Sequence, residues 1–320
     1  MINALLDKFR PIARSIKYGR LHRRAQTDAT KLNVPPLNPP VSFIFGCGRS
    51  GTTILGKLLA EHKEVFYLFE PYHIWRAIHP ATDMIQLYGD NGGDTHCILG
   101  SEYVTEFEIQ KFNACMQCEL ERNGASKKHL IEKTPINAMR IPLLSALSPK
   151  SPMLHLVRNG VDVIRSIERL SISNSYQMRG KGNWNQWWGR DHCKWKALAA
   201  DAELLHLYSG EIQLLKSDTE MGALEWLVSL HEINRCRNEL GSRLLEVQYN
   251  KLTEDPQGEL TKICNHFGIK PDIKWLEYCD NQLDSARINR GSQIVLPPEM
   301  CKAFNGFQEE YGFEGRATTA

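Results

Sequence analysis

Short apolar runs alternate with stretches of helical periodicity along most of the chain, and this alternation restricts the folds that are open to it. The runs that read as strands are residues 41–46, 64–69, 129–133, 152–157 and 243–249. The helical patterns cover residues 52–62, 136–147, 161–170, a stretch ending near residue 269, and most of residues 171–240. Strands that alternate with helices predict a mainly parallel sheet with helices on both faces. We therefore expect an α/β protein whose ligands bind beyond the carboxyl ends of the strands.

The charge of the chain is concentrated at its amino-terminal end. The net charge is +2, but residues 1–33 contain eight Lys or Arg against two Asp, a net of +6, which leaves −4 for the remainder. A body with this balance does not have the composition of a nucleic-acid-binding protein. The length of 320 residues suits one enzyme-sized domain. We therefore divide the chain into an amino-terminal segment, residues 1–40, and a single domain, residues 41–320.

Residues 1–26 have the pattern of a basic amphipathic helix. The apolar positions recur at steps of three or four: Ile2, Leu5, Phe9, Ile12 and Ile16. Such a helix either packs on the body of the protein or lies on an anionic membrane surface, and its Arg-rich, acid-poor composition also resembles a transit peptide. Pro11 would allow two short helices in place of one. Residues 34–40, VPPLNPP, are expected to form a stiff linker into the domain.

The cysteines and the hydropathy of the sequence indicate in which cellular compartment the protein is expected. The chain has neither a run of 18 apolar residues nor the compact apolar core of a secretory signal. Its nine cysteines are irregularly spaced, and only Cys115 and Cys118 form a close pair, which is weak support for zinc or redox chemistry. No His, Cys or Asp cluster has metal-ligand spacing. We expect free thiols, no metal, and a cytoplasmic protein that is either free or peripheral at a membrane surface.

The loop after the first strand contains Gly46, Gly48 and Gly51, and three types of nucleotide-binding loop are compatible with it. It fits the G-x-G-x-x-G pattern of dinucleotide-binding proteins and nearly fits the Walker P-loop. The third type is a loop for a phosphosulfate. All three use glycines to bring backbone N–H groups to a phosphate at a helix N-terminus, so the local context does not decide between them.

Residues around the loop weigh on these alternatives. Glu70 ends the second strand where a ribose-binding acid is expected, which favours a dinucleotide. Two features argue against a dinucleotide. That motif needs no cation in the loop, where this chain has Arg49, and it has small apolar residues at the start of the helix, where this chain has Thr52-Thr53. Thr52 also stands where a Walker loop has its Lys. An NAD-dependent oxidoreductase and a non-catalytic nucleotide-binding module are the alternatives that remain beside the phosphosulfate loop.

Four ordered segments resemble the sulfotransferases that use 3′-phosphoadenosine 5′-phosphosulfate, PAPS. Residues 48–53, GRSGTT, look like the 5′-phosphosulfate loop of that family. Residues 155–170, HLVRNGVDVIRSIERL, are similar to its 3′-phosphate segment. Residues 132–144 and 247–269 also look like family segments. The resemblance implies a P-loop-like parallel sheet, with residues 171–240 as a helical insertion that binds the acceptor.

The resemblance implies two anion-binding positions, which suits a ligand with a phosphosulfate at one end and a 3′-phosphate at the other. The implied nucleotide-binding residues are Gly48, Arg49, Ser50, Gly51, Thr52, Thr53, Arg158, Ser166, Tyr249 and Arg290. Loop amides and hydroxyls suit one anion, while the Arg158 guanidinium and the Ser166 hydroxyl suit the other. Taken alone, Arg158 could instead form an ion pair with Asp162.

Catalysis by such an enzyme needs cations near the transferred group and a base for the acceptor proton. Arg49 and Lys133, which ends the third strand, are the expected cations. Glu70 is the expected base, because it resembles the Glu of the protein-tyrosine and carbohydrate branches and the third strand carries no His. The alternatives for Glu70 are a helix N-cap or a salt bridge with Arg49, and His73 is the reserve base.

The acceptor is less determined by the sequence. Residues 183–195, NWNQWWGRDHCKW, combine aromatic and polar side chains that suit a small-molecule or glycan acceptor, and we expect a hydroxyl of a carbohydrate or glycolipid. At helical spacing, Trp184, Trp188 and Trp195 could equally belong to the core. Arg287, Arg290 and Ser292 are expected to close over the nucleotide, as a late basic segment does in the family.

Overall fold

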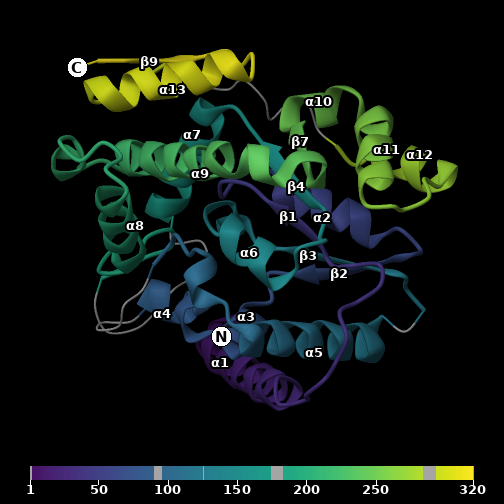
Figure 1. Ribbon diagram of the computed structural model, residues 1–320. Coiled ribbons are helices and arrows are strands. Elements are labelled where there is room, and N and C mark those ends of the chain that lie inside the picture. Colours follow the sequence, from purple (N-terminus) through teal and green to yellow (C-terminus); the bar gives the residue numbers. More distant parts are fainter. Residues whose placement is uncertain (1, 90–95, 125, 174–182, 284–292, 320) are drawn as a thin grey trace.

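The computed structural model describes residues 2–89, 96–124, 126–173, 183–283 and 293–319 (Figure 1). At its centre is a sheet of five parallel strands, in the order β2-β3-β1-β4-β7. The strands are β1 (Ser42–Phe45), β2 (Val65–Phe69), β3 (His129–Lys133), β4 (Met153–Val157) and β7 (Leu244–Gln248). The α/β architecture and the five predicted strands are confirmed, with differences of at most one residue at each end.

The strand order also corrects the dinucleotide hypothesis. In a Rossmann sheet the second strand lies beside the first, so that its terminal acid reaches the ribose of the bound dinucleotide. Here β3 lies between β1 and β2, and Glu70 therefore follows a strand that is not adjacent to the glycine loop. The spacing between the loop and Glu70 in the sequence favoured a dinucleotide. In the structure Glu70 does not lie beside β1, so this spacing does not support a ribose-binding role.

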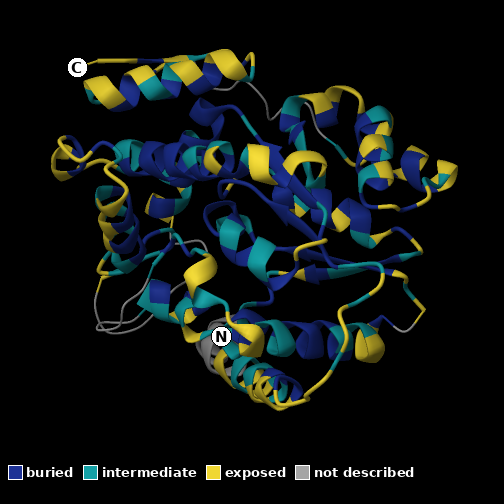
Figure 2. Cartoon of the chain, viewed as in Figure 1, coloured by how far each residue is buried: buried dark blue, intermediate teal, exposed yellow. Residues whose placement is uncertain are grey.

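Helices cover both faces of the sheet, so the sheet forms the buried middle layer (Figure 2). Side chains of β1 alternate between the faces. Ile44 packs in a cluster with residues of α2 (Thr52–Ala60), α11 (Pro256–His266) and α12 (Ile273–Asp280). Phe43 packs in another cluster, with residues of α3 (Tyr72–Ile78) and α5 (Glu106–Asn123). Both faces of β1 are therefore covered by apolar clusters, which explains the apolar run of residues 43–45.

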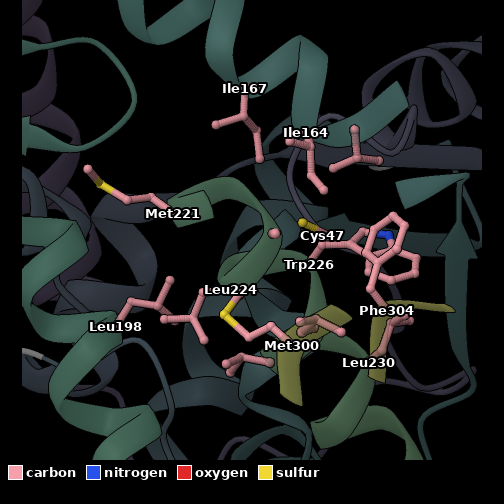
Figure 3. Packing of buried hydrophobic residues seen from close by; sticks show 14 of the residues in the cluster. Cys47, Ile164, Ile167, Leu198, Met221, Leu224, Trp226, Leu230, Met300 and Phe304 are labelled. Atoms are coloured by element: carbon pink, nitrogen blue, oxygen red, sulfur yellow. The ribbon is translucent and has the colours of Figure 1, made fainter. Parts of the chain in front are cut away.

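The largest apolar cluster lies beyond the sheet, where α7 (Gly160–Ser173), α8 (Cys193–Leu204), α9 (Asp218–Leu240) and α13 (Pro298–Glu310) meet (Figure 3). Trp226 of α9 packs against Phe304 of α13, with ring centroids 4.9 Å apart. Cys47 of the glycine loop belongs to the same cluster. The helical region between β4 and β7 is thus packed directly against the loop after β1.

The remaining elements are short and mostly connect these layers. They are α4 (Met84–Gly89), α6 (Ile141–Leu147), α10 (Tyr249–Glu254), the 3₁₀ turns η1 (Pro80–Thr82), η2 (Ser101–Tyr103), η3 (Pro135–Met139), η4 (Ile212–Leu214) and η5 (Gly241–Arg243), and the small sheets β5 (Trp184–Asn185) with β6 (Gly189–Arg190) and β8 (Gln293–Val295) with β9 (Arg316–Thr318). The predicted helix over residues 136–147 is divided between η3 and α6.

The tryptophan-rich segment forms a hairpin rather than the helix that would have placed its tryptophans on one face. Strands β5 and β6 pair antiparallel, with Trp184 opposite Arg190. The Asn185 side chain accepts hydrogen bonds from the N–H groups of Trp187 and Trp188, at 2.8 and 2.9 Å. A short polar side chain that binds the backbone in this way favours a turn over a helix. The three tryptophans therefore do not share a helix face.

The amino-terminal helix α1 (Ile2–Asp28) is continuous past Pro11 and packs against α3 and α5. Its Arg24 forms an ion pair with Glu119 of α5 at 2.7 Å, and its Asp28 pairs with Arg122 at 2.6 Å. The carboxyl-terminal part of α1 is thus attached to the body of the protein. Within the described residues, no helix is both long and apolar enough to cross a membrane.

Candidate active site

The predicted site residues meet at one edge of the sheet. Taken in sheet order, they are Glu70 after β2, Lys133 at the end of β3, the loop of residues 46–51 after β1, Arg158 after β4 and Tyr249 after β7. Because parallel strands end at the same edge, residues as far apart in the sequence as Gly51 and Tyr249 become neighbours there. Five consecutive strand ends therefore form a continuous row of polar groups.

The loop that leads into α2 is closely packed at two of its glycines. Gly51 has φ = 98°, in the left-handed region, and a Cβ atom there would lie 2.4 Å from the Tyr249 ring. At Gly48 a Cβ atom would lie 2.4 Å from the Trp187 ring. The first N–H groups of α2 have no acceptor within the helix, so together with the loop they offer donors and a positive dipole end to an anion.

Lys133 and Glu70 form an ion pair beside this loop. Lys133 Nζ lies 2.5 Å from Glu70 Oε1 and donates a hydrogen bond to the Thr53 hydroxyl at 3.2 Å. The second carboxylate oxygen of Glu70 accepts a hydrogen bond from the Tyr72 hydroxyl at 2.7 Å. Lys133 thus links Glu70 to the start of α2. The salt-bridge alternative for Glu70 is found, but its partner is Lys133 and not Arg49.

Burial distinguishes the two members of this pair. The Lys133 side chain is fully buried, whereas that of Glu70 is 21% exposed. Burial lowers the pKa of Lys133 below its ordinary value, although the Glu70 carboxylate opposes that shift. Glu70 also has an unusual backbone, with φ = 42°. The buried cation and the partly exposed carboxylate leave Glu70 as the member that solvent can reach.

A second group of residues lies on the other side of the loop. Arg49 Nε donates to the Ser166 hydroxyl of α7 at 3.0 Å, and the Arg158 guanidinium lies over the Tyr249 ring, 4.7 Å from its centroid. Arg158 also approaches Asp162 at 3.4 Å, the ion pair considered as its alternative role. Four of the predicted nucleotide-binding residues are therefore in contact in two pairs, and Arg49 extends toward Ser166.

The reserve base His73 lies on α3, on the side that packs against α1. Its ring packs edge-on against Tyr18 of α1, with centroids 6.3 Å apart. Its buried Nε2 atom has no hydrogen-bond partner among the described residues. Burial lowers the pKa of His73 to about 4, so the imidazole is neutral at neutral pH. His73 thus has the surroundings of a packing residue.

Three residues in contact near the loop were not assigned to it from the sequence: Trp187, Lys194 and Glu225. Trp187 and Lys194 fall within the segment of residues 183–195 that was expected to suit the acceptor. Trp187 Nε1 donates to Glu225 Oε2 at 2.7 Å, and Lys194 Nζ lies 2.8 Å from both carboxylate oxygens. Lys194 and Glu225 are 31 residues apart and both buried. A buried charge requires a partner, but no local spacing identifies which residue that partner is.

The other tryptophans have different surroundings. Trp188 is fully buried and donates to Asp218 at 2.7 Å, so it belongs to the core. Trp195 packs edge-on against it, and the Arg190 guanidinium lies 4.9 Å from the Trp184 ring centroid. Arg287, Arg290 and Ser292 lie outside the described residues. Among the residues that are described, no three His, Cys, Asp or Glu side chains gather as in a metal site.

Comparison with known proteins agrees with this geometry. The model of the sulfotransferase family matches residues 40–208, just over half of the chain. The chain is 23% identical to nodulation protein NoeE of Sinorhizobium fredii over 244 residues, which cover 75% of this chain and 52% of NoeE. It thus spans about half the length of that relative. Carbohydrate sulfotransferase 7 of Mus musculus is 41% identical over 39 residues, 12% of this chain and 8% of that protein.

Solved structures show the same fold. The sulfotransferase domain of the Synechococcus PCC 7002 olefin synthase superposes with a TM-score of 0.53 at 18% identity, over 89% of this chain and 99% of that domain. The sulfotransferase domain of the curacin biosynthetic pathway gives 0.53 at 17% identity, over 88% and 99%. The fold, the row of polar strand ends and the family match lead to one conclusion: this chain belongs to the sulfotransferase family.

Proposed function

We propose that this protein transfers a sulfuryl group from PAPS to a hydroxyl group of a carbohydrate or glycolipid. The observation that carries the proposal is the row of polar strand ends, where the buried Lys133, paired with the partly exposed Glu70, adjoins the first turn of α2 and Arg158 and Ser166 lie beyond it. A donor with two separated anionic groups matches this row better than a donor with one. Membership of the sulfotransferase family supports the same reaction.

The donor would be held at two places. The loop amides of residues 48–51 and the hydroxyls of Thr52 and Thr53 would bind the 5′-phosphosulfate, since they surround a helix N-terminus. Arg158 and Ser166 would bind the 3′-phosphate, because an Arg presents several donors to phosphate oxygens. Tyr249, which packs between Gly51 and Arg158, would keep these two places at a fixed separation.

PAPS, when bound, supplies the sulfuryl group and leaves as adenosine 3′,5′-bisphosphate. Glu70 would accept the proton of the acceptor hydroxyl as its oxygen forms the new bond to sulfur. Lys133 Nζ, between Glu70 and Thr53, would stabilise the negative charge that develops on the bridging oxygen when its bond to sulfur breaks. Arg49 would contribute positive charge at the loop, and its contact with Ser166 gives it a role toward the 3′-phosphate as well.

The acceptor class rests on two further observations. The Trp184 ring and the Arg190 guanidinium pack together on the hairpin, which offers an aromatic face and hydrogen-bond donors suited to a sugar. One relative with a matching segment is named a carbohydrate sulfotransferase. Both observations favour a sugar hydroxyl.

A thermal-shift comparison tests the donor. The purified chain is heated with adenosine 3′,5′-bisphosphate, NAD or ATP, because a ligand that binds the folded state raises its stability by about 2.7 kcal/mol at one hundred times its Kd. We expect stabilisation by the bisphosphate and none by NAD. Stabilisation by NAD alone would overturn the proposal. Stabilisation by the bisphosphate without sulfate transfer to a broad carbohydrate panel would favour a non-catalytic nucleotide-binding module.

We also propose that the enzyme works in a reducing, cytoplasmic environment and contacts anionic membrane through α1. All nine cysteines are free thiols, and Lys17, Arg20 and Arg23 are exposed on that helix. Each basic residue near an anionic surface contributes about 1 kcal/mol, screened by salt. Sedimentation with anionic vesicles should therefore fall as salt rises. Equal sedimentation after Lys17, Arg20 and Arg23 are changed to Gln would contradict membrane contact through this face.

A further inference from the structure

Beneath the glycine loop lies a buried ion pair that the proposed transfer step does not use. Lys194 of α8 and Glu225 of α9 are only 3% and 5% exposed, and Lys194 Nζ lies 2.8 Å from both Glu225 oxygens. The Trp187 and Trp188 rings flank the ammonium group, with centroids 4.2 and 5.2 Å away. A charge pair so fully removed from water is maintained only where its geometry is well satisfied.

Trp187 connects this pair to the loop. Its Nε1 donates to Glu225 Oε2 at 2.7 Å, while the far edge of its ring packs against Gly48, so that a Cβ atom there would lie 2.4 Å from the ring. The same Cβ position is 3.7 Å from Glu225 Oε1. The ring and the carboxylate therefore both lie directly against the loop backbone. A displacement of either one would move Gly48 or leave a gap beside it.

The charge of Glu225 also has a consequence for an anion at this loop. A lone carboxylate this close to the loop would repel a phosphosulfate in a region of low dielectric. Lys194, which binds both carboxylate oxygens, compensates that charge. The pair thus keeps Glu225 available to hold Trp187 without a net negative charge under the loop.

We infer that Trp187, Glu225 and Lys194 are positioning residues that fix the shape and the local charge of the donor loop from below. This inference rests on the proposed function, because it assigns the three residues to the binding of the PAPS phosphosulfate. They come from the hairpin region, α8 and α9, so they couple the helical insertion to the donor loop.

A matched pair of variants tests the positioning role. Trp187→Phe removes the indole N–H that binds Glu225, whereas Trp188→Phe removes an indole N–H that binds Asp218 at the same 2.7 Å and leaves the hydrogen bond between Trp187 and Glu225 in place. We expect both variants to lower the Tm similarly, but only Trp187→Phe to raise the Kd for adenosine 3′,5′-bisphosphate, by about fivefold. Isothermal titration calorimetry measures the Kd. Equal affinities of the two variants would overturn the inference.

A suppressor experiment tests the contact at Gly48. Gly48→Ala alone should weaken bisphosphate binding, because the added methyl group collides with the far edge of the Trp187 ring, which a Phe lacks. Gly48→Ala combined with Trp187→Phe should then bind better than the product of the two single effects predicts. Strictly multiplicative effects would show that Trp187 does not set the position of the loop.

A comparison of a single and a double variant tests how the charges of Lys194 and Glu225 affect the affinity for the bisphosphate. Lys194→Met should weaken bisphosphate binding by about tenfold or more, and adding Glu225→Gln should restore part of the affinity because the uncompensated carboxylate is removed. No recovery in the double variant would overturn the electrostatic part. Failure of the proposed function is distinguishable, since the wild type itself would then not bind the bisphosphate.

Discussion

Two lysine–carboxylate pairs adjoin the same loop and differ in their surroundings. Lys133 and Glu70 adjoin its carboxyl-terminal end through Thr53, and the Glu70 side chain is 21% exposed. Lys194 and Glu225 lie under Gly48, and neither side chain is more than 5% exposed. The first pair has a member that solvent can reach. The second is enclosed, which suits a structural role rather than a chemical one.

The pKa values of the two lysines move in opposite directions. Burial lowers the pKa of Lys133, and the single contact with Glu70 does not offset it. Burial also lowers the pKa of Lys194, but Glu225 and Tyr88 more than offset this, so that its pKa is raised. The contact with both carboxylate oxygens explains the difference. The charged form is therefore held more firmly at Lys194 than at Lys133.

The largest difference between the pairs should appear in stability. Lys194→Met leaves Glu225 buried without a partner, so the free energy of unfolding should fall by about 3–5 kcal/mol. Lys133→Met leaves Glu70 partly solvated and bound to Tyr72, and should cost about 1 kcal/mol. Urea unfolding followed by circular dichroism measures both. Equal losses would show that exposure does not distinguish the two pairs.

The turnover rate, unlike the stability, should depend strongly on the Lys133–Glu70 pair. Glu70→Gln removes the proposed base and should lower kcat by roughly a hundredfold or more. Its affinity for adenosine 3′,5′-bisphosphate should stay within about twofold of wild type, because Glu70 lies outside the two proposed phosphate positions. Steady-state kinetics and calorimetry give the two values. A near-normal kcat would remove Glu70 from the mechanism.

Arg158 belongs to neither pair and should separate donor binding from chemistry. Arg158→Ala removes a guanidinium from the proposed 3′-phosphate position and should raise the Kd for the bisphosphate by about tenfold. Ser166→Ala, which removes only a hydroxyl, should have a smaller effect. Titration with adenosine 5′-phosphate, which lacks the 3′-phosphate, serves as the control. Equal weakening toward both nucleotides would contradict the assignment of Arg158.

The opposite pKa shifts predict different responses to alkaline pH. Between the lowered pKa of folded Lys133 and its ordinary 10.5, the unfolded chain binds more protons at this residue, so its contribution to stability rises with pH. The contribution of Lys194, whose pKa is raised, is complete below 10.5 and is lost above it. From pH 7 to 10, the stability of wild type should therefore increase relative to Lys133→Met and stay constant relative to Lys194→Met. The reverse pattern in urea unfolding would contradict these shifts.

The smallest effect on activity is expected at His73, near Glu70 in sequence but packed against α1. His73→Gln should change kcat by less than about twofold. Because the pKa of His73 is about 4 when folded and 6.5 when unfolded, wild type should lose stability as the pH falls through this range, and the variant should lose less. A large loss of kcat in His73→Gln would return this residue to the position of candidate base.

Local sequence patterns predicted the strands of the sheet well. They predicted only some of the contacts between residues at the carboxyl ends of those strands. Apolar runs bounded by loops gave all five strands, and the polar residues at their ends fall at one edge because the strands are parallel. The strand order, which separates Glu70 from the loop, depends on crossovers that no local pattern encodes. The hairpin at Trp184 was missed because Asn185 stabilises a turn within apparently helical spacing.

The ion pairs show the same limit. Glu70 could have paired with any nearby cation, and its choice of Lys133 follows from the register that places Phe69 beside Lys133 on neighbouring strands. The Lys194–Glu225 pair joins two helices across 31 residues, and their burial arises only when those helices pack together. Long-range packing, rather than residue type, decides which charges meet.

The most direct test of the account is a single-turnover experiment with PAPS labelled with ³⁵S in the sulfuryl group. Enzyme in excess over labelled PAPS is mixed with a panel of carbohydrate acceptors, and label on the acceptor is followed with time. We expect wild type to label at least one sugar, and Glu70→Gln to bind the donor normally yet transfer roughly a hundredfold more slowly. Equal transfer rates in the two proteins, or no labelled acceptor with donor-bound wild type, would contradict the assignment of Glu70 and Lys133 to sulfuryl transfer.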